Sequence, residues 1–564
     1  MKRTNIFFTI GFVLSVNVLR WSRAELYTAI ADMEPLLETH KRIIDDLDDY
    51  ISKEERRLIT LKKHLNVYKD EHEKAMNDIP NYLGNPIHAF TLIKRLTTDL
   101  DYIEHSIKIG TEYIKNITMN HDDVKYPTME DLTGAAQALT RLQETYHLDV
   151  RELAEGLLNG VAYSAGRCLL TSTPMSTSDC FELGRALYNH KDYKNAISWM
   201  TQALNKYGDD DGSLPFTEVE ILEYISFSYY LIDDVKNALI WTRKLLELDP
   251  KHPRARGNIP HYEKTIAEEE KRLWKQRRGV IHMICLNGFL VLVGGPYARE
   301  RKNYEALCRG ETNIDPDVAR RLTCKYLTEN HPFLRLAAVK AEQLYINPDI
   351  YLFYDVISDS EIEQIKEMAR PRFKRAVVHD PKTGELVPAH YRISKSAWLR
   401  DTHAPVVERL SRRVADISGL SMSSAEELQV VNYGIGGHYE PHFDFARRQE
   451  NAFANFNGNR IATILFYMSE VGQGGATVFT ELGLRVAPVK GAAAFWMNLH
   501  PSGEGDLATR HAACPVLRGS KWVCNKWLHQ GGQELLRPCN LQYQDEGMLR
   551  PKYYIIPRPV MFGQ

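Results

Sequence analysis

The stretch LQVVNYGIGGHYEPHFDF, residues 428–445, decides the fold class of the C-terminal part of this 564-residue chain. Its first segment, Leu428–Tyr433, is mostly apolar or aromatic, and the glycines that follow it mark a turn. This pattern predicts a β-strand that ends shortly before His442-Phe443-Asp444. Because successive side chains of an extended chain point to opposite faces, His442 and Asp444 point to the same side.

The same β-rich texture continues beyond this stretch. Short apolar runs separated by glycines predict further strands at Ile461–Tyr467, Ala476–Phe479, Ala492–Met497 and Lys521–Trp527. Several short strands with turn signals between them favour a β-sandwich or jelly roll, the double-stranded β-helix. Two helical segments, Asp359–Met368 and Ala404–Ile417, are expected to support one face of it, within a catalytic domain over residues 341–564.

A His-x-Asp motif has little meaning alone, because this chain contains it four times, beginning at His121, His147, His190 and His442. Only the fourth copy has a distal partner, His511, which begins another β run 69 residues after His442. Two imidazoles and one carboxylate on one face of an octahedron leave three positions open, as oxygen-activating non-haem Fe(II) requires. Two of those positions suit a chelating oxoacid, and the third suits O2.

Ten residues after His511 comes Lys521, on the next predicted strand. A cation there can pair with the far carboxylate of 2-oxoglutarate once the keto-acid end is on iron. Taken alone, a lysine at this position would be predicted to be an exposed residue of a strand. Its spacing from the metal triad favours the alternative, that Lys521 binds the oxoacid. A zinc hydrolase is the competing metal site, but the triad contains a carboxylate and has no nearby glutamate to act as a base.

The N-terminus has the layout of a secretory signal peptide over residues 1–24. Lys2 and Arg3 precede the apolar run Ile6–Leu19, and small residues stand before a cleavage point at Glu25. A membrane anchor is the alternative, but a span needs about 20 apolar residues. Secretory entry also makes the sequon at Asn116 a candidate glycosylation site.

The other gross features exclude some classes of function and leave the cysteines open. A net charge of −2 without a long basic run argues against a nucleic-acid binder. The eight cysteines become candidates for disulfides in a secreted protein. Cys308 and Cys324 flank one short polar segment, and Cys514 and Cys539 bracket the end of the catalytic region, but spacing alone does not assign connectivity.

Residues 25–145 are predicted to be a helical assembly domain. Apolar residues recur every seven positions, at Leu37, Ile44, Ile51, Leu58 and Leu65. A stripe of this kind faces a partner helix in a coiled coil, which predicts self-association. One helix of an intramolecular bundle is an equally good reading of the same pattern.

Residues 146–262 are predicted to form tetratricopeptide-like helical hairpins that bind a peptide. Two copies of an alanine-containing pattern occur 42 residues apart, at Ala196 and Ala238. Five aromatic residues crowd the region: Tyr188, Tyr193, Tyr224, Phe227 and Tyr230. They either bind a proline-rich ligand in a groove or fill the helix core. A linker over 263–340 follows, and its apolar run Val280–Val293 is too short for a membrane span.

The residues around the metal ligands resemble collagen prolyl 4-hydroxylase α subunits, a family of Fe(II)- and 2-oxoglutarate-dependent dioxygenases. The resemblance rests on residues 429–445, 459–463, 474–479, 509–515 and 521–529, and it spans roughly Tyr304 to Cys539. The N-terminal helix and the tetratricopeptide-like region resemble that family's assembly and peptide-binding domains more loosely. Cys524 stands where relatives usually have serine, and Phe227 replaces a tyrosine of the peptide groove.

The resemblance implies hydroxylation of proline at C4 in X-Pro-Gly sequences of procollagen, with 2-oxoglutarate converted to succinate and CO2. It places His442, Asp444 and His511 on iron and Lys521 on the C5 carboxylate of 2-oxoglutarate, with ascorbate keeping the iron reduced. Further roles are implied by position: oxoacid binding by Tyr433 and His529, peptide binding by Tyr439, Arg460 and Trp527, and disulfides Cys308–Cys324 and Cys514–Cys539.

The resemblance also implies an assembly and a location. The family works as an α2β2 tetramer whose β subunit is protein disulfide isomerase, and that partner would hold the chain in the lumen of the endoplasmic reticulum. Two other functions fit the same residues. One is a non-catalytic collagen-binding or chaperone subunit with a vestigial site, and the other is a hydroxylase of another secreted proline-rich protein.

Overall fold

The computed structural model describes residues 28–77, 103, 128–158, 170–171, 174–208, 214–280, 296–379, 385–389, 391–434, 436–447, 453 and 457–539. The predicted signal peptide, the sequon at Asn116 and nearly all of the apolar run Val280–Val293 lie outside these residues. The chain divides into two compact units, one of residues 32–127 and one that combines residues 1–31 with residues 128–564. Among the described helices, none is long and apolar enough to cross a membrane.

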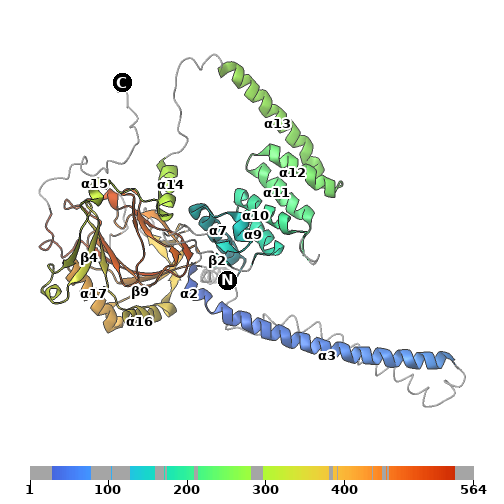
Figure 1. The fold of residues 1–564 in the computed structure, drawn as a ribbon, viewed down its shortest axis with the longest axis horizontal. Helices are drawn as coiled ribbons and strands as arrows, with labels where there is room; N and C mark the ends of the chain where they lie inside the picture. The colour runs from blue at the N-terminus through green and yellow to red at the C-terminus, as the bar shows by residue number, and fades with distance from the viewer. Residues whose placement is uncertain are drawn as a thin grey trace, which may run out of the picture. The chain divides into compact units, whose positions relative to one another are not determined.

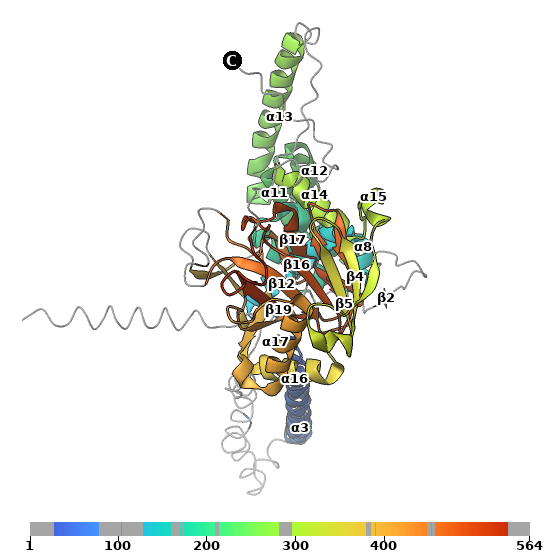
Figure 2. The same cartoon turned by 90° about the vertical axis from the view of Figure 1, so that its left-hand side faces the viewer.

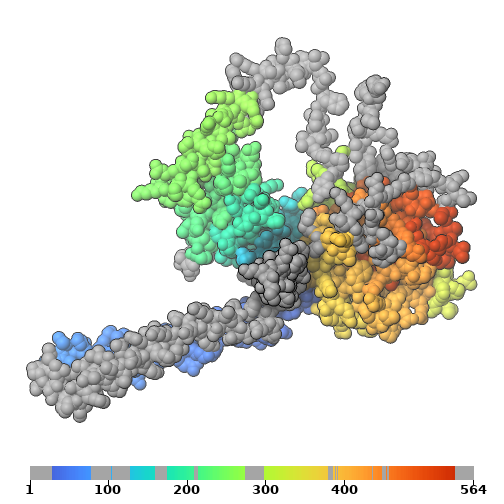
Figure 3. All heavy atoms as spheres, turned by 180° about the vertical axis from the view of Figure 1, so that it is seen from behind, coloured from blue at the N-terminus to red at the C-terminus, as the bar shows by residue number. Residues whose placement is uncertain are grey.

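The smaller unit is dominated by one helix, α3 (Leu36–Asn77), of 42 residues, which follows the short α2 (Ile30–Met33). It is the long blue rod of Figure 1, also visible in Figure 3. The apolar stripe that recurs every seven residues is solvent-exposed within this chain. The exposed fraction ranges from 46% for Ile51 to 74% for Leu37. The predicted long helix is therefore confirmed, and its apolar stripe has no cover from the described residues.

The helical repeats consist of α9 (Thr177–Asn189), α10 (Tyr193–Lys206), α11 (Glu218–Leu231), α12 (Val235–Leu248) and α13 (Pro253–Val280), stacked in sequence (Figure 1). Ser176 and Thr217 begin α9 and α11 with capping boxes, which satisfy backbone N–H groups that a helix start leaves free. Trp199, Met200 and Ile225 are fully buried between the helices. The predicted helical hairpins are confirmed.

Two antiparallel sheets build the C-terminal domain (Figure 2). The larger has the order β3 (Cys324–Leu327), β4 (Val339–Tyr345), β5 (Ile350–Tyr354), β16 (Ala493–Met497), β12 (Arg460–Tyr467), β19 (Trp522–His529), β10 (Leu428–Tyr433), β9 (Ser394–Leu399), β6 (Lys374–Arg375). The smaller has the order β11 (Tyr439–His442), β17 (His511–Ala513), β14 (Thr477–Phe479), β15 (Leu484–Val486).

The remaining elements are short or lie outside the sheets. The paired strands are β1 (Leu157–Leu158) with β2 (Leu170–Thr171), β7 (Val377–His379) with β8 (Leu386–Pro388), and β13 (Gln473–Gly474) with β18 (Val516–Arg518). The helices are α7 (Met129–Tyr146), α8 (Val150–Ala154), α14 (Pro296–Cys308) and α15 (Pro316–Ala319).

Two helices support the larger sheet on the face away from the smaller one: α16 (Asp359–Ala369) and α17 (Pro405–Ser418). The apolar stripe of α17 packs in the same core cluster as strands β10 and β12, with Val407, Leu410 and Val414 almost fully buried. Each such side chain contributes about 1.5–3 kcal/mol of transfer free energy. The opposite face meets the smaller sheet, where Leu465 and Val523 pack with Phe479 and Trp496. The predicted strands and both supporting helices are confirmed within one or two residues.

The predicted disulfides are wrong. The structure joins Cys308 to Cys514, with their Cα atoms 5.5 Å apart, whereas Cys324 and Cys539 are free and exposed. The reason is the packing of α14, which lies against β14 and β15 and places its last residue, Cys308, beside the end of β17. Tyr304 on the same helix donates a hydrogen bond to the Ala513 carbonyl at 3.3 Å, which holds the two segments together.

We therefore predict one linked peptide pair in the non-reduced protein, containing Cys308 and Cys514. The measurement is proteolysis of alkylated, non-reduced protein followed by mass spectrometry. Cys324 and Cys539 serve as internal controls, because both should carry the alkyl group. Recovery of Cys308–Cys324 and Cys514–Cys539 peptides would contradict the structure.

Candidate active site

Three side chains converge on one point between the two strands β11 and β17. These strands pair antiparallel, with His442 opposite His511, so the two imidazole rings lie 4.4 Å apart between centroids. Asp444 follows β11 by two residues; its two carboxylate oxygens lie 3.7 Å from His442 Nε2 and 3.7 Å from His511 Nε2. One ligand atom from each residue lies within 4.8 Å of the others, which suits a single metal ion.

Backbone carbonyl groups orient both imidazoles. His442 Nδ1 lies 2.8 Å from the Glu440 carbonyl oxygen, and His511 Nδ1 lies 2.9 Å from that of Thr509. A carbonyl oxygen only accepts, so each Nδ1 carries the proton and each Nε2 offers its lone pair to the metal. Burial, together with the neighbouring His511 imidazole, holds the pKa of His442 well below its ordinary value, which keeps the ring neutral.

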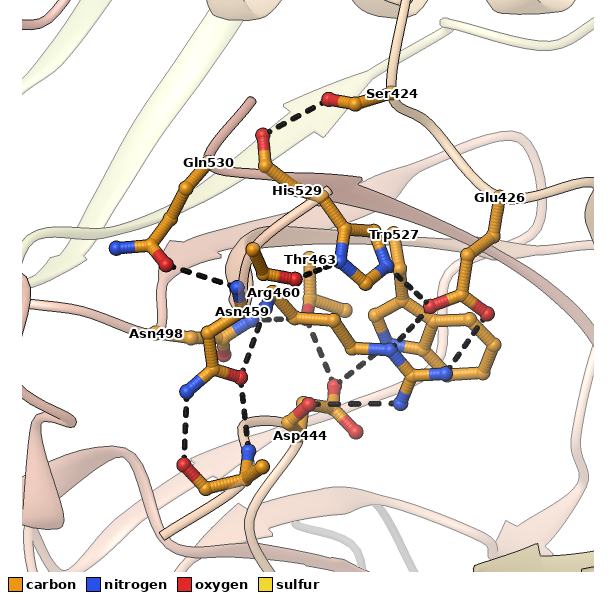
Figure 4. Close-up of polar contacts among 12 residues, drawn as sticks. Ser424, Glu426, Asp444, Asn459, Arg460, Thr463, Asn498, Trp527, His529 and Gln530 are labelled. Carbon is orange, nitrogen blue, oxygen red and sulfur yellow. Dashed lines mark hydrogen bonds and ion pairs between the residues drawn. The ribbon is translucent and has the colours of Figure 1, made fainter. Parts of the chain in front are cut away.

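The Asp444 carboxylate is held by two donors on the same oxygen. Oδ2 accepts hydrogen bonds from Thr463 Oγ1 at 2.8 Å and from Trp527 Nε1 at 3.0 Å (Figure 4). Burial alone would raise the pKa of Asp444, but His511, His442, Arg460 and the indole N–H together lower it to about 2. The aspartate is therefore ionised, as a metal ligand must be.

Apolar rings surround the triad. Tyr439 stacks on His442 with centroids 3.6 Å apart, and Trp496 meets His511 edge-on at 4.8 Å. Phe479 lies 5.6 Å from His511 on another side. These contacts limit the rotation of both imidazole rings.

Lys521 completes the cavity, which has a volume of about 780 Å³ and is lined by the triad, Tyr433 and Lys521 among others. The lysine is 1% exposed, and its Nζ lies 5.0 Å from the centroid of the Tyr433 ring. Burial lowers the pKa of Lys521 to about 7. Within the described part of the chain, no carboxylate pairs with Lys521, so a buried cation is available to a carboxylate ligand.

The structure places the other predicted site residues in three groups. Tyr439, Arg460 and Trp527 line the same cavity as the triad, and their role in peptide binding stays a prediction. His529 is fully buried and does not line the cavity; its ring bonds to Glu426 and to the Gly458 carbonyl instead. The aromatic residues of the repeats lie on α9, α10 and α11.

Those five aromatic side chains are all half-buried. Tyr188 meets Tyr224 at 4.9 Å and Tyr193 at 5.5 Å between ring centroids, both edge-on, and Phe227 lies 5.7 Å from Tyr230. Each therefore both packs against its neighbours and offers surface to a ligand. The packing is therefore observed, and peptide binding by this cluster stays a prediction.

The sequence analysis did not identify two residues that bind side chains of the site. Thr463 is a polar residue in β12, all of whose residues are buried, and this anomaly was a usable signal. Glu426 lies just before β10 and has no local pattern that marks it.

A buried His-Asp-His triad beside an unpaired lysine, between two antiparallel sheets, defines a 2-oxoglutarate- and Fe(II)-dependent oxygenase. The residues fit both groups: neutral imidazoles and an ionised aspartate for Fe(II), and a buried cation for the oxoacid.

Comparison with known proteins agrees. Three family models match: Prolyl 4-Hydroxylase alpha-subunit, N-terminal region, at residues 29–160; Prolyl 4-hydroxylase peptide-substrate-binding domain at 177–268; and 2OG-Fe(II) oxygenase superfamily at 428–529. Prolyl 4-hydroxylase subunit alpha-2 of Caenorhabditis elegans is 46% identical over 92% of this chain and 94% of its own length. Subunit alpha-1 of Gallus gallus is 45% identical over 92% and 99%, and that of Homo sapiens 42% over 94% and 99%. The chain belongs to the prolyl 4-hydroxylase α-subunit family.

The depressed pKa of Lys521 predicts how oxoacid binding depends on pH. Below pH 7 the amine is protonated and attracts a carboxylate; above pH 7 it loses its proton, so the KM for 2-oxoglutarate should rise by up to about tenfold per pH unit. The control is Lys521→Arg, whose guanidinium stays charged at every pH tested. We expect a flatter pH profile for this variant, measured as succinate formation at varied 2-oxoglutarate. Equal slopes in both proteins would assign the pH dependence to another group.

Proposed function

We propose that this chain is the catalytic α subunit of a procollagen-proline 4-dioxygenase. It hydroxylates proline at C4 in X-Pro-Gly sequences of collagen-like chains, and 2-oxoglutarate and O2 are consumed as succinate and CO2 form. The observation that carries the proposal is the intact site: all three metal ligands and Lys521 meet in one cavity. A vestigial site would be expected to have lost at least one of them.

In this proposal His442, Asp444 and His511 hold iron, which supplies the oxygen chemistry, and ascorbate keeps the iron reduced. Lys521 binds the C5 carboxylate of 2-oxoglutarate beside Tyr433. The two antiparallel sheets around the cavity support assignment to the jelly-roll class. Any role of His529 in oxoacid binding or decarboxylation would be indirect, since its ring faces Glu426 and Gly458.

Substrate binding is shared between two places. Tyr439, Arg460 and Trp527 would contact the residue that reacts, because they line the cavity beside the metal. The half-buried tyrosines of α9, α10 and α11 would bind a further segment of the same proline-rich chain, whose polyproline-II form loses little entropy on binding. Two weak contacts on one chain raise the effective concentration of each.

The test of catalysis is His442→Ala, assayed with Fe(II), 2-oxoglutarate, ascorbate and a (Pro-Pro-Gly) repeat peptide. We expect hydroxyproline formation to fall below detection, because the metal loses one of three ligands. The matched control is His190→Ala, which removes the exposed histidine of another His-x-Asp motif that binds no metal by this proposal, and it should keep wild-type activity. A wild-type protein that forms neither succinate nor hydroxyproline would instead favour the non-catalytic collagen-binding function.

The third function, hydroxylation of another secreted proline-rich protein, keeps the same site and changes the peptide. A panel of proline-rich peptides with and without the X-Pro-Gly repeat separates it from the first. Equal turnover of the two sets would favour the broader substrate.

We further propose an α2β2 assembly with protein disulfide isomerase in the lumen of the endoplasmic reticulum, with α3 joining two α subunits. The exposed seven-residue stripe of α3 supports this, because a coiled coil would bury it. Ile51→Glu, which places a charge on the stripe, should halve the mass of the native complex. Lys62→Glu, on an exposed position outside the stripe, should leave that mass unchanged. Native mass spectrometry of the co-expressed proteins distinguishes the outcomes, and an unchanged mass for Ile51→Glu would exclude α3 as the joint.

A further inference from the structure

A buried ionic cluster consists of Glu426 and Arg460, which line the cavity, and His529, which does not (Figure 4). Glu426 accepts hydrogen bonds from Arg460 Nε and, at 2.9 Å, from Arg460 Nη2. His529 Nε2 lies 2.9 Å from the same carboxylate. All three residues are at most 9% exposed, so the ions are shielded from water and depend on one another.

The cluster contains two cations and one anion. His529 Nδ1 lies 2.7 Å from the Gly458 carbonyl oxygen, and its Nε2 faces the Glu426 carboxylate. Both partners only accept, so both ring nitrogens donate and the imidazole carries a proton on each. Glu426 is therefore the anion that Arg460 and His529 share. Burial alone would raise the pKa of Glu426, but Arg460 and His529 lower it to about 2.

Two contacts connect this cluster to the metal site. The Arg460 guanidinium lies over Trp527, with its carbon 3.9 Å from the ring centroid, and Trp527 donates its indole N–H to Asp444. The Glu426 backbone N–H also donates to the Trp527 carbonyl at 2.9 Å. Glu426 thus contacts Trp527 in two ways. Its backbone N–H binds the Trp527 carbonyl directly, and its carboxylate positions Arg460, which lies over the Trp527 ring.

Arg460 also keeps donors for a ligand. Of its five N–H groups, two bind Glu426 and one reaches the Asp444 carbonyl at a long 3.5 Å, which leaves two. Arg460 lines the cavity, so these two are in reach of an acceptor there. In a peptide substrate the acceptors are backbone carbonyl oxygens, and a prolyl residue adds no backbone donor to compete with them.

We propose that Glu426 is a positioning residue for the peptide: it fixes the plane of Arg460 so that the remaining N–H groups of the guanidinium meet a substrate carbonyl beside the iron. This inference rests on the proposed function, because it assigns a role in the same reaction. Glu426 touches neither the metal ligands nor Lys521 through any contact seen in the described residues. Its loss should therefore alter peptide binding and leave oxoacid binding intact.

Glu426→Gln is the test, because it keeps the shape and turns one acceptor oxygen into an amide N–H that faces Arg460 or His529. We expect the KM for a (Pro-Pro-Gly) repeat peptide to rise at least about tenfold, as for other broken buried charge pairs at a binding surface. The KM for 2-oxoglutarate, and succinate formation without peptide, should stay within about twofold of wild type, since Lys521 and the triad are unchanged.

The matched control is Glu361→Gln. Glu361 is buried and pairs with Arg413 at 3.0 Å between α16 and α17, away from the cavity, so it loses the same kind of ion pair. It should lower the Tm and leave the peptide KM unchanged. If Glu426→Gln fails to yield folded protein while Glu361→Gln does, Glu426 is a folding residue and the inference is wrong.

A double-mutant cycle shows whether Glu426 acts through Arg460. Arg460→Gln should raise the peptide KM. Adding Glu426→Gln to this variant should raise the KM little further, because the guanidinium that Glu426 positions is already absent. Additive effects, or an unchanged peptide KM in Glu426→Gln, would overturn the inference. An inactive wild-type enzyme would overturn the proposed function itself, which the same assay shows separately.

Discussion

The pairing of β11 with β17 is the constraint on which the rest of the site depends. Its register sets His442 opposite His511. Because β11 ends at His442, the carboxylate of Asp444, two residues later, lies close to both rings. A slip of β11 by one residue would turn His442 to the other face of the sheet, away from His511. Neighbouring strand β14 pairs with β17 and fixes the same register from the other side.

Two buried carboxylates beside the metal site are stabilised by their partners. Asp444 accepts hydrogen bonds from Thr463 and Trp527, and Glu426 pairs with Arg460 and His529. Removing a single partner from such a group leaves an uncompensated buried charge, at a cost of about 3–5 kcal/mol. Lys521, in contrast, has no carboxylate partner among the described residues of the cavity. Under the proposed function, a dicarboxylate ligand would supply this counter-charge.

Much of the fold was predictable from local pattern. The strands of the C-terminal domain and helices α16 and α17 follow apolar periodicity, capping residues and glycine turns, all of which act within a few residues. The four candidate residues for iron and oxoacid were also predictable. Only one of the four His-x-Asp copies is followed by a distal histidine and lysine, which excluded the other three as metal sites. Thr463 was within reach of the same reasoning, as a polar residue in a wholly buried strand. The cysteine pairs were not, since spacing left the connectivity open and the family resemblance implied Cys308 with Cys324, whereas α14 packs its end against β17.

The sequence by itself therefore determined the kinds of element, the ligand set and the family, because each depends on residue type and short spacing. Only the tertiary structure decided which distant groups meet. It turned His529 away from the cavity toward Glu426, joined Cys308 to Cys514, and placed Arg460 over Trp527. These contacts join residues that are 103 positions apart for His529 and Glu426 and 206 for the two cysteines, and no local pattern encodes them. They form when the sheets and helices pack, because only packing brings these distant residues into contact.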